Sequence, residues 1–170
     1  CSYLVSVASP FIVFSFDFTM TFTMEVPDAY GYVILGCAVL PVFTNLYMGG
    51  PVMKARSKFK VPYPNLYATP GYHKQADEFN RVQRGHQNMF EMITSFTALS
   101  LLGGIKHPIV TAVGGVFFCV GSVLFQIGYA DTALDVKTAR YKKGGMLKWI
   151  GLFLPLGTSI SLAGSMIGIW

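Results

Sequence analysis

The chain is poor in charged residues. Asp, Glu, Lys and Arg make up 12% of its 170 residues, whereas 52% are apolar. Soluble globular domains carry about 25% charged residues. The composition therefore argues against a soluble protein and for a membrane protein.

Paired cysteines and clustered histidines are also lacking. Cys1, Cys37 and Cys119 have no regular spacing, so they form neither a disulfide framework nor a CxxC redox or metal pair. The three histidines lie at intervals that do not suit a metal site. We therefore predict no metal.

Four segments are long and apolar enough to cross a bilayer, which takes about 20 mostly apolar residues. They are Tyr30–Met53, Phe79–Gly103, Pro108–Ala130 and Met146–Trp170. Each span must satisfy its own backbone hydrogen bonds inside the membrane. The predicted fold class is therefore all-α, a bundle of four transmembrane helices.

Positive charge is concentrated in two stretches. Twelve of the 13 Lys and Arg residues lie between Lys54 and Arg84 or between Lys137 and Lys148. With four spans, both stretches fall on one face of the membrane, which the positive-inside rule makes cytoplasmic or its organellar equivalent. This charge either sets topology alone or also attracts an anionic small molecule. Nucleic acid is not a predicted partner, because the basic residues flank spans and form no groove interleaved with aromatic side chains.

We predict two parts: a hydrophobic N-terminal segment, residues 1–23, and the four-helix membrane domain, residues 24–170. The segment contains no Lys or Arg, which makes a secretory signal a weak interpretation. Met24 could be the true start, or the segment could be an additional hydrophobic element that docks against lipid or a partner.

The second apolar segment has an unusual polar stripe. At about 100° per residue, Arg81, Arg84, Asn88 and Glu91 fall within roughly 80° of one another on a helix. Polar groups in hydrocarbon are costly unless they face a protein interior or a wet cavity, so such a cluster indicates a functional site.

Two motifs connect this stripe to a known family. The sequence MKARSKFKVPYPNLY occupies positions 53–67, and FNRVQRGHQN occupies positions 79–88, followed by Glu91. Together they resemble the MAPEG family of membrane proteins in eicosanoid and glutathione metabolism, and within it the type 3 branch of microsomal glutathione S-transferases. The resemblance extends over about residues 30–170. It implies a homotrimer of four-helix protomers in the endoplasmic reticulum, or alternatively in a mitochondrial or plastid membrane.

The resemblance also implies a site for glutathione as co-substrate, between adjacent subunits. By position, Arg84, Asn88 and Glu91 match the residues that hold glutathione. His86 matches a polar contact made across the subunit interface. Members of the family conjugate glutathione to lipophilic electrophiles, reduce lipid hydroperoxides, or bind lipid without catalysis.

Three further residues match positions outside that helix segment. Arg56 matches a basic residue at the end of the first helix, and Tyr129 matches a tyrosine of the third. Arg140 matches the arginine that stabilises the glutathione thiolate, and it is the predicted catalytic residue.

The chemistry of glutathione suits these residue types independently. Its two carboxylates fit arginine forks, and its ammonium fits the carboxylate of Glu91. The thiolate is the nucleophile, whereas a free thiol has a pKa near 8.5. Lowering that pKa by about 2 units takes roughly 2.7 kcal/mol of preferential thiolate stabilisation, which one well-placed arginine could supply.

Each candidate also has a structural interpretation. Arg84, Asn88 and Glu91 could form a polar network that fixes helix packing, and His86 could be an interhelical hydrogen-bonding residue. Arg56 and Arg140 could be solvated topology charges, and Tyr129 an interfacial anchor. These alternatives stay open at the level of the sequence.

Three positions depart from the pattern. Ser122 and Phe125 stand where many relatives have an arginine and a tyrosine, and Ser57 replaces a basic residue. The departures motivate a second hypothesis: a non-catalytic, structural or lipid-binding MAPEG-like subunit of a larger respiratory or photosynthetic membrane complex.

Overall fold

Four long helices make up the body of the molecule. The computed structural model describes residues 25–169, and within that range every regular element is helical. The elements are Tyr30–Val33 (α1), Ile34–Val39 (η1, a π-helix), Leu40–Lys58 (α2), Ala76–Lys106 (α3), Pro108–Ala130 (α4), Ala139–Lys142 (α5) and Leu147–Met166 (α6). The all-α prediction is confirmed, whereas the additional segment expected at 1–23 lies outside the described residues.

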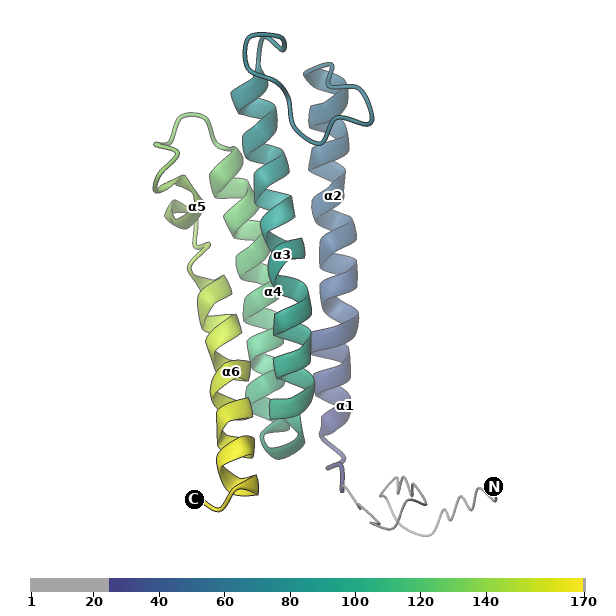
Figure 1. Cartoon of the computed structure of the whole chain (residues 1–170), viewed down its shortest axis with the longest axis vertical. Coiled ribbons are helices and arrows are strands. Elements are labelled where there is room, and N and C mark those ends of the chain that lie inside the picture. Colours follow the sequence, from purple (N-terminus) through teal and green to yellow (C-terminus); the bar gives the residue numbers. More distant parts are fainter. Residues whose placement is uncertain (1–24, 170) are drawn as a thin grey trace, which may run out of the picture.

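The first span is one long helix with a π-helical insertion. α1, η1 and α2 follow one another without a break and form a single rod in Figure 1. The sequence predicts that Pro41 and Pro51 kink this helix or break its last turn. The helix instead continues through Pro51 to Lys58. Pro41 lies in the first turn of α2, directly after the π-helical turns.

Between residues 25 and 169, three helical segments are long and apolar enough to span a membrane: Tyr30–Lys58, Pro108–Ala130 and Leu147–Met166. The segment predicted as the second span is helical throughout and belongs to α3, but α3 does not reach the same apolarity. Its 31 residues are about 46 Å long, more than the roughly 30 Å hydrocarbon core of a bilayer. Its N-terminal half is simply too polar. The four-helix bundle is confirmed. The prediction of the second span rested on its apolar latter half alone, and α3 is not among the helices apolar enough to span a membrane.

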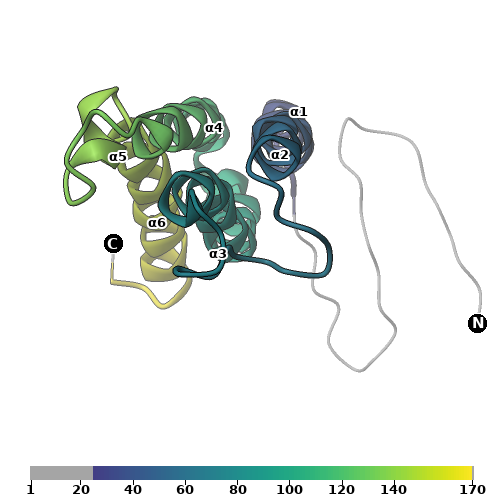
Figure 2. The ribbon, with the colours of Figure 1, turned by 90° about the horizontal axis from the view of Figure 1, so that it is seen from above.

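The two longer connections lie at the same end of the bundle. Figure 1 shows the segment between α2 and α3, and the segment between α4 and α6, at the upper end, with the tight α3–α4 turn at the other. Both basic stretches therefore share one face, as the sequence predicts. Seen from above, α2 packs on one side of the α3–α4 pair and α6 on the other (Figure 2).

Glycine allows α4 and α6 to approach closely. A Cβ added at Gly121 would lie 2.0 Å from the backbone nitrogen of Lys148, and one at Gly151 would lie 2.2 Å from that of Phe118. Any larger side chain would push the two helices apart, as in other membrane helix pairs that use small residues. This contact holds the first turn of α6 against the middle of α4.

Candidate functional site

The outer face of α3 carries an ion pair. Nη1 of Arg84 donates to the Glu91 carboxylate, and the two side chains are 40% and 42% exposed. The residues are seven positions apart, about two helical turns, so the arginine extends along the helix axis to reach its partner. A cation and an anion are thus presented together on an open face of the protomer.

Asn88 lies between these two residues and is held from α6. Nζ of Lys148 donates to Oδ1 of Asn88 at 2.6 Å and to its backbone carbonyl at 3.2 Å. Lys148 itself is completely buried. Its Nζ lies 5.5 Å from the ring centroid of Phe118 and 5.2 Å from that of Phe125, both of α4. Lys148 also interacts electrostatically with Glu91 and Arg84, so it belongs to the same cluster.

Sequence reasoning missed the role of Lys148. It counted this lysine among the basic residues at the end of a polar loop. The available signal was its position: a single cation directly inside the apolar segment that follows Gly144 and Gly145. A charge placed there has to find a polar partner on a neighbouring helix.

Arg81 does not share the environment of Arg84. Its side chain is buried and donates to three backbone carbonyls, those of Tyr129 at 2.7 Å, Asp131 at 2.7 Å and Leu134 at 3.0 Å. It thereby ties α3 to the end of α4 and the loop that follows. The helical angle alone grouped Arg81 with Arg84, Asn88 and Glu91. The structure corrects this grouping, because Arg81 is committed to main-chain acceptors inside the fold.

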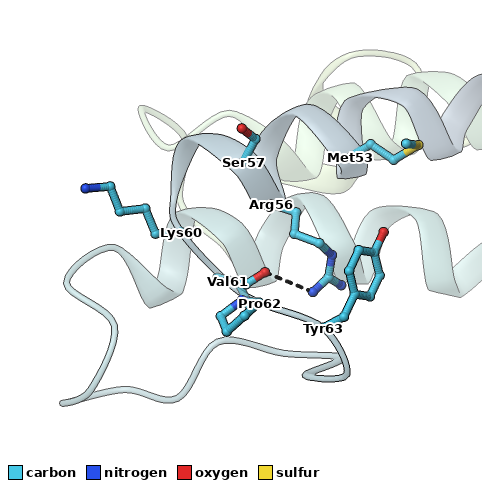
Figure 3. A pocket seen from close by; sticks show the side chains of 7 residues that line it. All are labelled: Met53, Arg56, Ser57, Lys60, Val61, Pro62 and Tyr63. Atoms are coloured by element: carbon cyan, nitrogen blue, oxygen red, sulfur yellow. Dashed lines mark hydrogen bonds between the residues drawn. The ribbon is translucent and has the colours of Figure 1, made fainter.

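Arg56 stabilises the loop between α2 and α3. Its Nη1 donates to the carbonyls of Val61 at 3.2 Å and Asn65 at 2.7 Å, and its guanidinium lies 4.4 Å from the ring centroid of Tyr63. An open pocket of about 480 Å³ adjoins it. Figure 3 shows the residues that line this pocket: Met53, Arg56, Ser57, Lys60, Val61, Pro62 and Tyr63. The pocket is thus a basic and partly aromatic recess at the C-terminal end of α2.

His86 and Tyr129 lie on other sides of the bundle. Nε2 of His86 is 2.9 Å from Oδ1 and 3.2 Å from the backbone carbonyl of Asn45, so this ring faces α2. Tyr129 contributes its carbonyl to Arg81, and its ring centroid lies 6.0 Å from that of Phe125. Within one chain, both residues take part in packing between helices.

Arg140 lies in the short helix α5. Its guanidinium is 5.2 Å from the ring centroid of the adjacent Tyr141, and its buried Nε has no hydrogen-bond partner among residues 25–169. This short helix lies between the third and fourth predicted spans and was not predicted from the sequence. The structure brings Arg84, Asn88, Glu91 and Lys148 together in one chain, and it places Arg140 on a separate element.

An ion pair orders the same connection. Nζ of Lys143 lies 2.8 Å from the carboxylate of Asp131. The lysine, together with the N–H of Ala133, holds the pKa of the Asp131 carboxyl below its usual range. Asp131 also gives its backbone carbonyl to Arg81, so this loop is fixed from both sides.

Metal-ligating side chains do not gather in the described part of the chain: residues 25–169 contain no group of three or more His, Cys, Asp or Glu that could hold a metal. The polar cluster on α3 instead offers charged hydrogen-bonding groups of both signs. Such a set suits a small zwitterionic or anionic molecule.

Apolar helices in a bundle, with an ionic cluster on one of them, define a multi-pass integral membrane protein. A model of the MAPEG family matches residues 34–161, a range that includes every candidate residue named above. The chain therefore belongs to the MAPEG family, whose members are membrane proteins of glutathione and eicosanoid metabolism. Membership in its type 3 branch stays a prediction.

Proposed function

We propose that the protein is a membrane-bound glutathione transferase or peroxidase. It would conjugate glutathione to lipophilic electrophiles or reduce lipid hydroperoxides. The observation that carries the proposal is the exposed Arg84–Glu91 pair with Asn88 between its members. On a membrane-spanning helix an ion pair is costly unless it faces a wet cavity or a protein surface, so its exposure on the protomer supports a place where a ligand or a second subunit binds.

The charges of the cluster complement those of glutathione. Arg84 and Lys148 are cationic and Glu91 is anionic, so the cluster has a formal charge of +1. Glutathione has two carboxylates and one ammonium, so with a neutral thiol its charge is −1. On binding, the ligand would replace part of the Arg84–Glu91 contact: the guanidinium would take a carboxylate and Glu91 the ammonium.

A homotrimer would complete the site. The cluster lies on the outside of the protomer, where a neighbouring subunit could cover it. Arg56, His86, Tyr129 and Arg140 lie on other parts of the same chain, and a second copy could bring some of them to the cluster. In this arrangement His86 and Arg56 contact glutathione and Tyr129 lines the cleft.

Arg140 is the residue we assign to thiol activation. A guanidinium beside the sulfur favours the thiolate, which is the nucleophile. The thiolate attacks the electrophilic carbon of a substrate that enters from the bilayer, and a thioether forms as the leaving group departs. In the endoplasmic reticulum, the membrane we propose, such substrates dissolve in the lipid itself.

The test is turnover by the purified, detergent-solubilised protein. Conjugation of glutathione to a lipophilic aryl halide and reduction of a fatty-acid hydroperoxide are measured separately, with the particle mass determined on the same sample. We expect glutathione-dependent turnover in at least one assay and a mass of about three protomers plus detergent. Absence of turnover together with absence of glutathione binding at millimolar concentration would contradict the proposal.

One set of observations favours the alternative, a non-catalytic subunit of a larger membrane complex. Ser122 and Phe125 are 1% and 4% exposed and are used in the protomer core. The first span also exposes large side chains, including Phe43 at 64% and Tyr47 at 66%. Extraction in a mild detergent separates the two functions: a free trimer supports the enzyme, and a stable particle of many different subunits supports the alternative.

A further inference from the structure

We infer that Lys148 is a positioning residue that fixes the orientation of the Asn88 side-chain amide, so that Asn88 offers N–H donors to the ligand. The inference rests on the proposed function and adds a requirement to it. The group of the ligand beside Asn88 must be a hydrogen-bond acceptor, either a carboxylate or a peptide carbonyl.

The position of Lys148 is unfavourable for a lysine. It is fully buried, and it lies in the first turn of α6, where the helix dipole disfavours a cation. No carboxylate lies within 4.0 Å of its Nζ among residues 25–169. Burying a charge without close pairing is unfavourable. The cost is offset by the two aromatic rings of α4 and by the two oxygens of Asn88.

The contact fixes which end of the Asn88 amide faces α6. A lysine ammonium carries three donors and no acceptor, whereas the asparagine side chain has one oxygen that accepts and one NH₂ group that donates. The atom 2.6 Å from Nζ must therefore be Oδ1. The amide nitrogen then lies on the other side of the group, toward Glu91, with which Asn88 interacts.

This orientation gives the cluster a definite arrangement of hydrogen-bond donors and acceptors. Arg84 and the Asn88 amide nitrogen donate, and Glu91 accepts. Lys148 never needs to touch the ligand, because its effect is transmitted through Asn88. A ligand with an acceptor and an ammonium close together matches the pattern, and a ligand that presents a second donor to Asn88 does not.

Asn88→Asp separates positioning from packing. An aspartate keeps an oxygen for Lys148 and turns the contact into an ion pair, but it replaces the outward N–H donors with an acceptor. Because the new carboxylate also lies beside Glu91, we expect at most a modest change in unfolding temperature, and we expect glutathione affinity to fall at least tenfold. Lys148→Gln allows the Asn88 amide to take either orientation, so we expect a several-fold loss of affinity. The matched control, Lys142→Gln, removes an exposed lysine of α5, and we expect no change.

The experiment is a titration of the detergent-solubilised protein with glutathione, with thermal unfolding measured on each variant. If the natural protein binds and Asn88→Asp binds equally well, the inference fails and the proposed function stands. If the natural protein does not bind, both fail. Equal glutathione affinity in Lys148→Gln and in the natural protein would also overturn the inference, because it would mean that the Asn88 amide does not depend on Lys148 for its orientation.

Discussion

Arg81 and Arg84 are one helical turn apart in α3, yet they differ in burial and in hydrogen-bond partners. Arg81 is 6% exposed and is surrounded by three carbonyls that accept its hydrogen bonds. Arg84 has a 40% exposed side chain and a single carboxylate partner. Arg81 is committed to backbone acceptors within the fold, whereas we propose that Arg84 exchanges its carboxylate partner for a ligand.

The difference shows how α3 serves two purposes. On the Arg81 side the helix is joined to the end of α4 and to the loop that carries Asp131. On the Arg84 side it presents charge outward, steadied from within by Lys148 and Asn88. Substitutions on the two sides should therefore affect different measurements: folding for the first, and glutathione binding for the second.

The largest effect is expected for Arg81→Met. The substitution leaves three buried or partly buried carbonyls without their donor, and each unsatisfied group costs about 1–3 kcal/mol. We expect a destabilisation of about 3 kcal/mol or more, seen as a lower unfolding temperature and a lower yield of folded protein. Arg81→Lys retains the charge but has fewer donors, so its stability should lie between that of the natural protein and that of Arg81→Met. An Arg81→Met protein with natural stability would contradict the structural role.

Next in size is the effect of Arg84→Ala on ligand binding. Charged hydrogen bonds contribute about 1.5–3 kcal/mol, so we expect glutathione affinity to fall roughly 10- to 100-fold. Glu91 loses its ion-pair partner, so some loss of stability is expected as well, and affinity is measured on the folded variant. Glu91→Gln is the companion variant and should weaken binding of the ligand ammonium while leaving the fold intact. Isothermal titration measures the glutathione affinity of both variants. A large loss of stability without a loss of affinity would mean that Arg84 has a structural role and does not bind the ligand.

Arg140→Met should act on turnover more than on binding. If the guanidinium stabilises the thiolate, its removal raises the pKa of bound glutathione toward the free value near 8.5. The rising limb of kcat/KM against pH should then move to higher pH by about 1–2 units, with at most a small change in the dissociation constant of glutathione. An unchanged pH profile would mean that Arg140 does not stabilise the thiolate.

The smallest effect is expected for the pH dependence due to Asp131. Its pKa is lowered in the folded protein, first by Lys143 and then by the N–H of Ala133. The carboxylate therefore adds stability above its unfolded pKa of about 3.9, and this stability is lost as the pH falls through the folded value. Thermal unfolding between pH 6 and about pH 3 should show a steeper loss for the natural protein than for Asp131→Asn. Parallel curves would mean that the pair does not contribute.

The sequence predicts the helical architecture well, because span length and apolarity follow directly from composition. The segment Pro108–Ala130 is observed with its predicted bounds. Whether the polar half of α3 belongs to a span was harder to predict. Apolarity averaged over a whole helix does not describe a helix whose charged residues are gathered on one face. The uninterrupted passage through Pro51 also escaped prediction, because a proline exposed at the helix surface tolerates the loss of one N–H.

The site is predictable only in part. Spacing along one helix groups Arg84, Asn88 and Glu91, and the structure keeps them together. The same spacing includes Arg81, because an angle on a helix carries no information about which neighbouring carbonyls lie within reach. Lys148 belongs to another helix, and its contact with Asn88 depends on the close approach of α4 and α6 at Gly121, which no local pattern in the sequence specifies.

The central claim is that the Arg84 face of α3 is an open ligand site, whereas the Arg81 face is closed and structural. The unfolding temperature, measured against glutathione concentration for the natural protein and for Arg84→Ala, tests it most directly, since a ligand stabilises a protein by RT ln(1 + [L]/Kd). Relative to each protein's own unfolding temperature without ligand, we predict a steady rise with glutathione for the natural protein and no comparable rise for Arg84→Ala. Equal rises in both proteins, or none in the natural protein, would contradict the account.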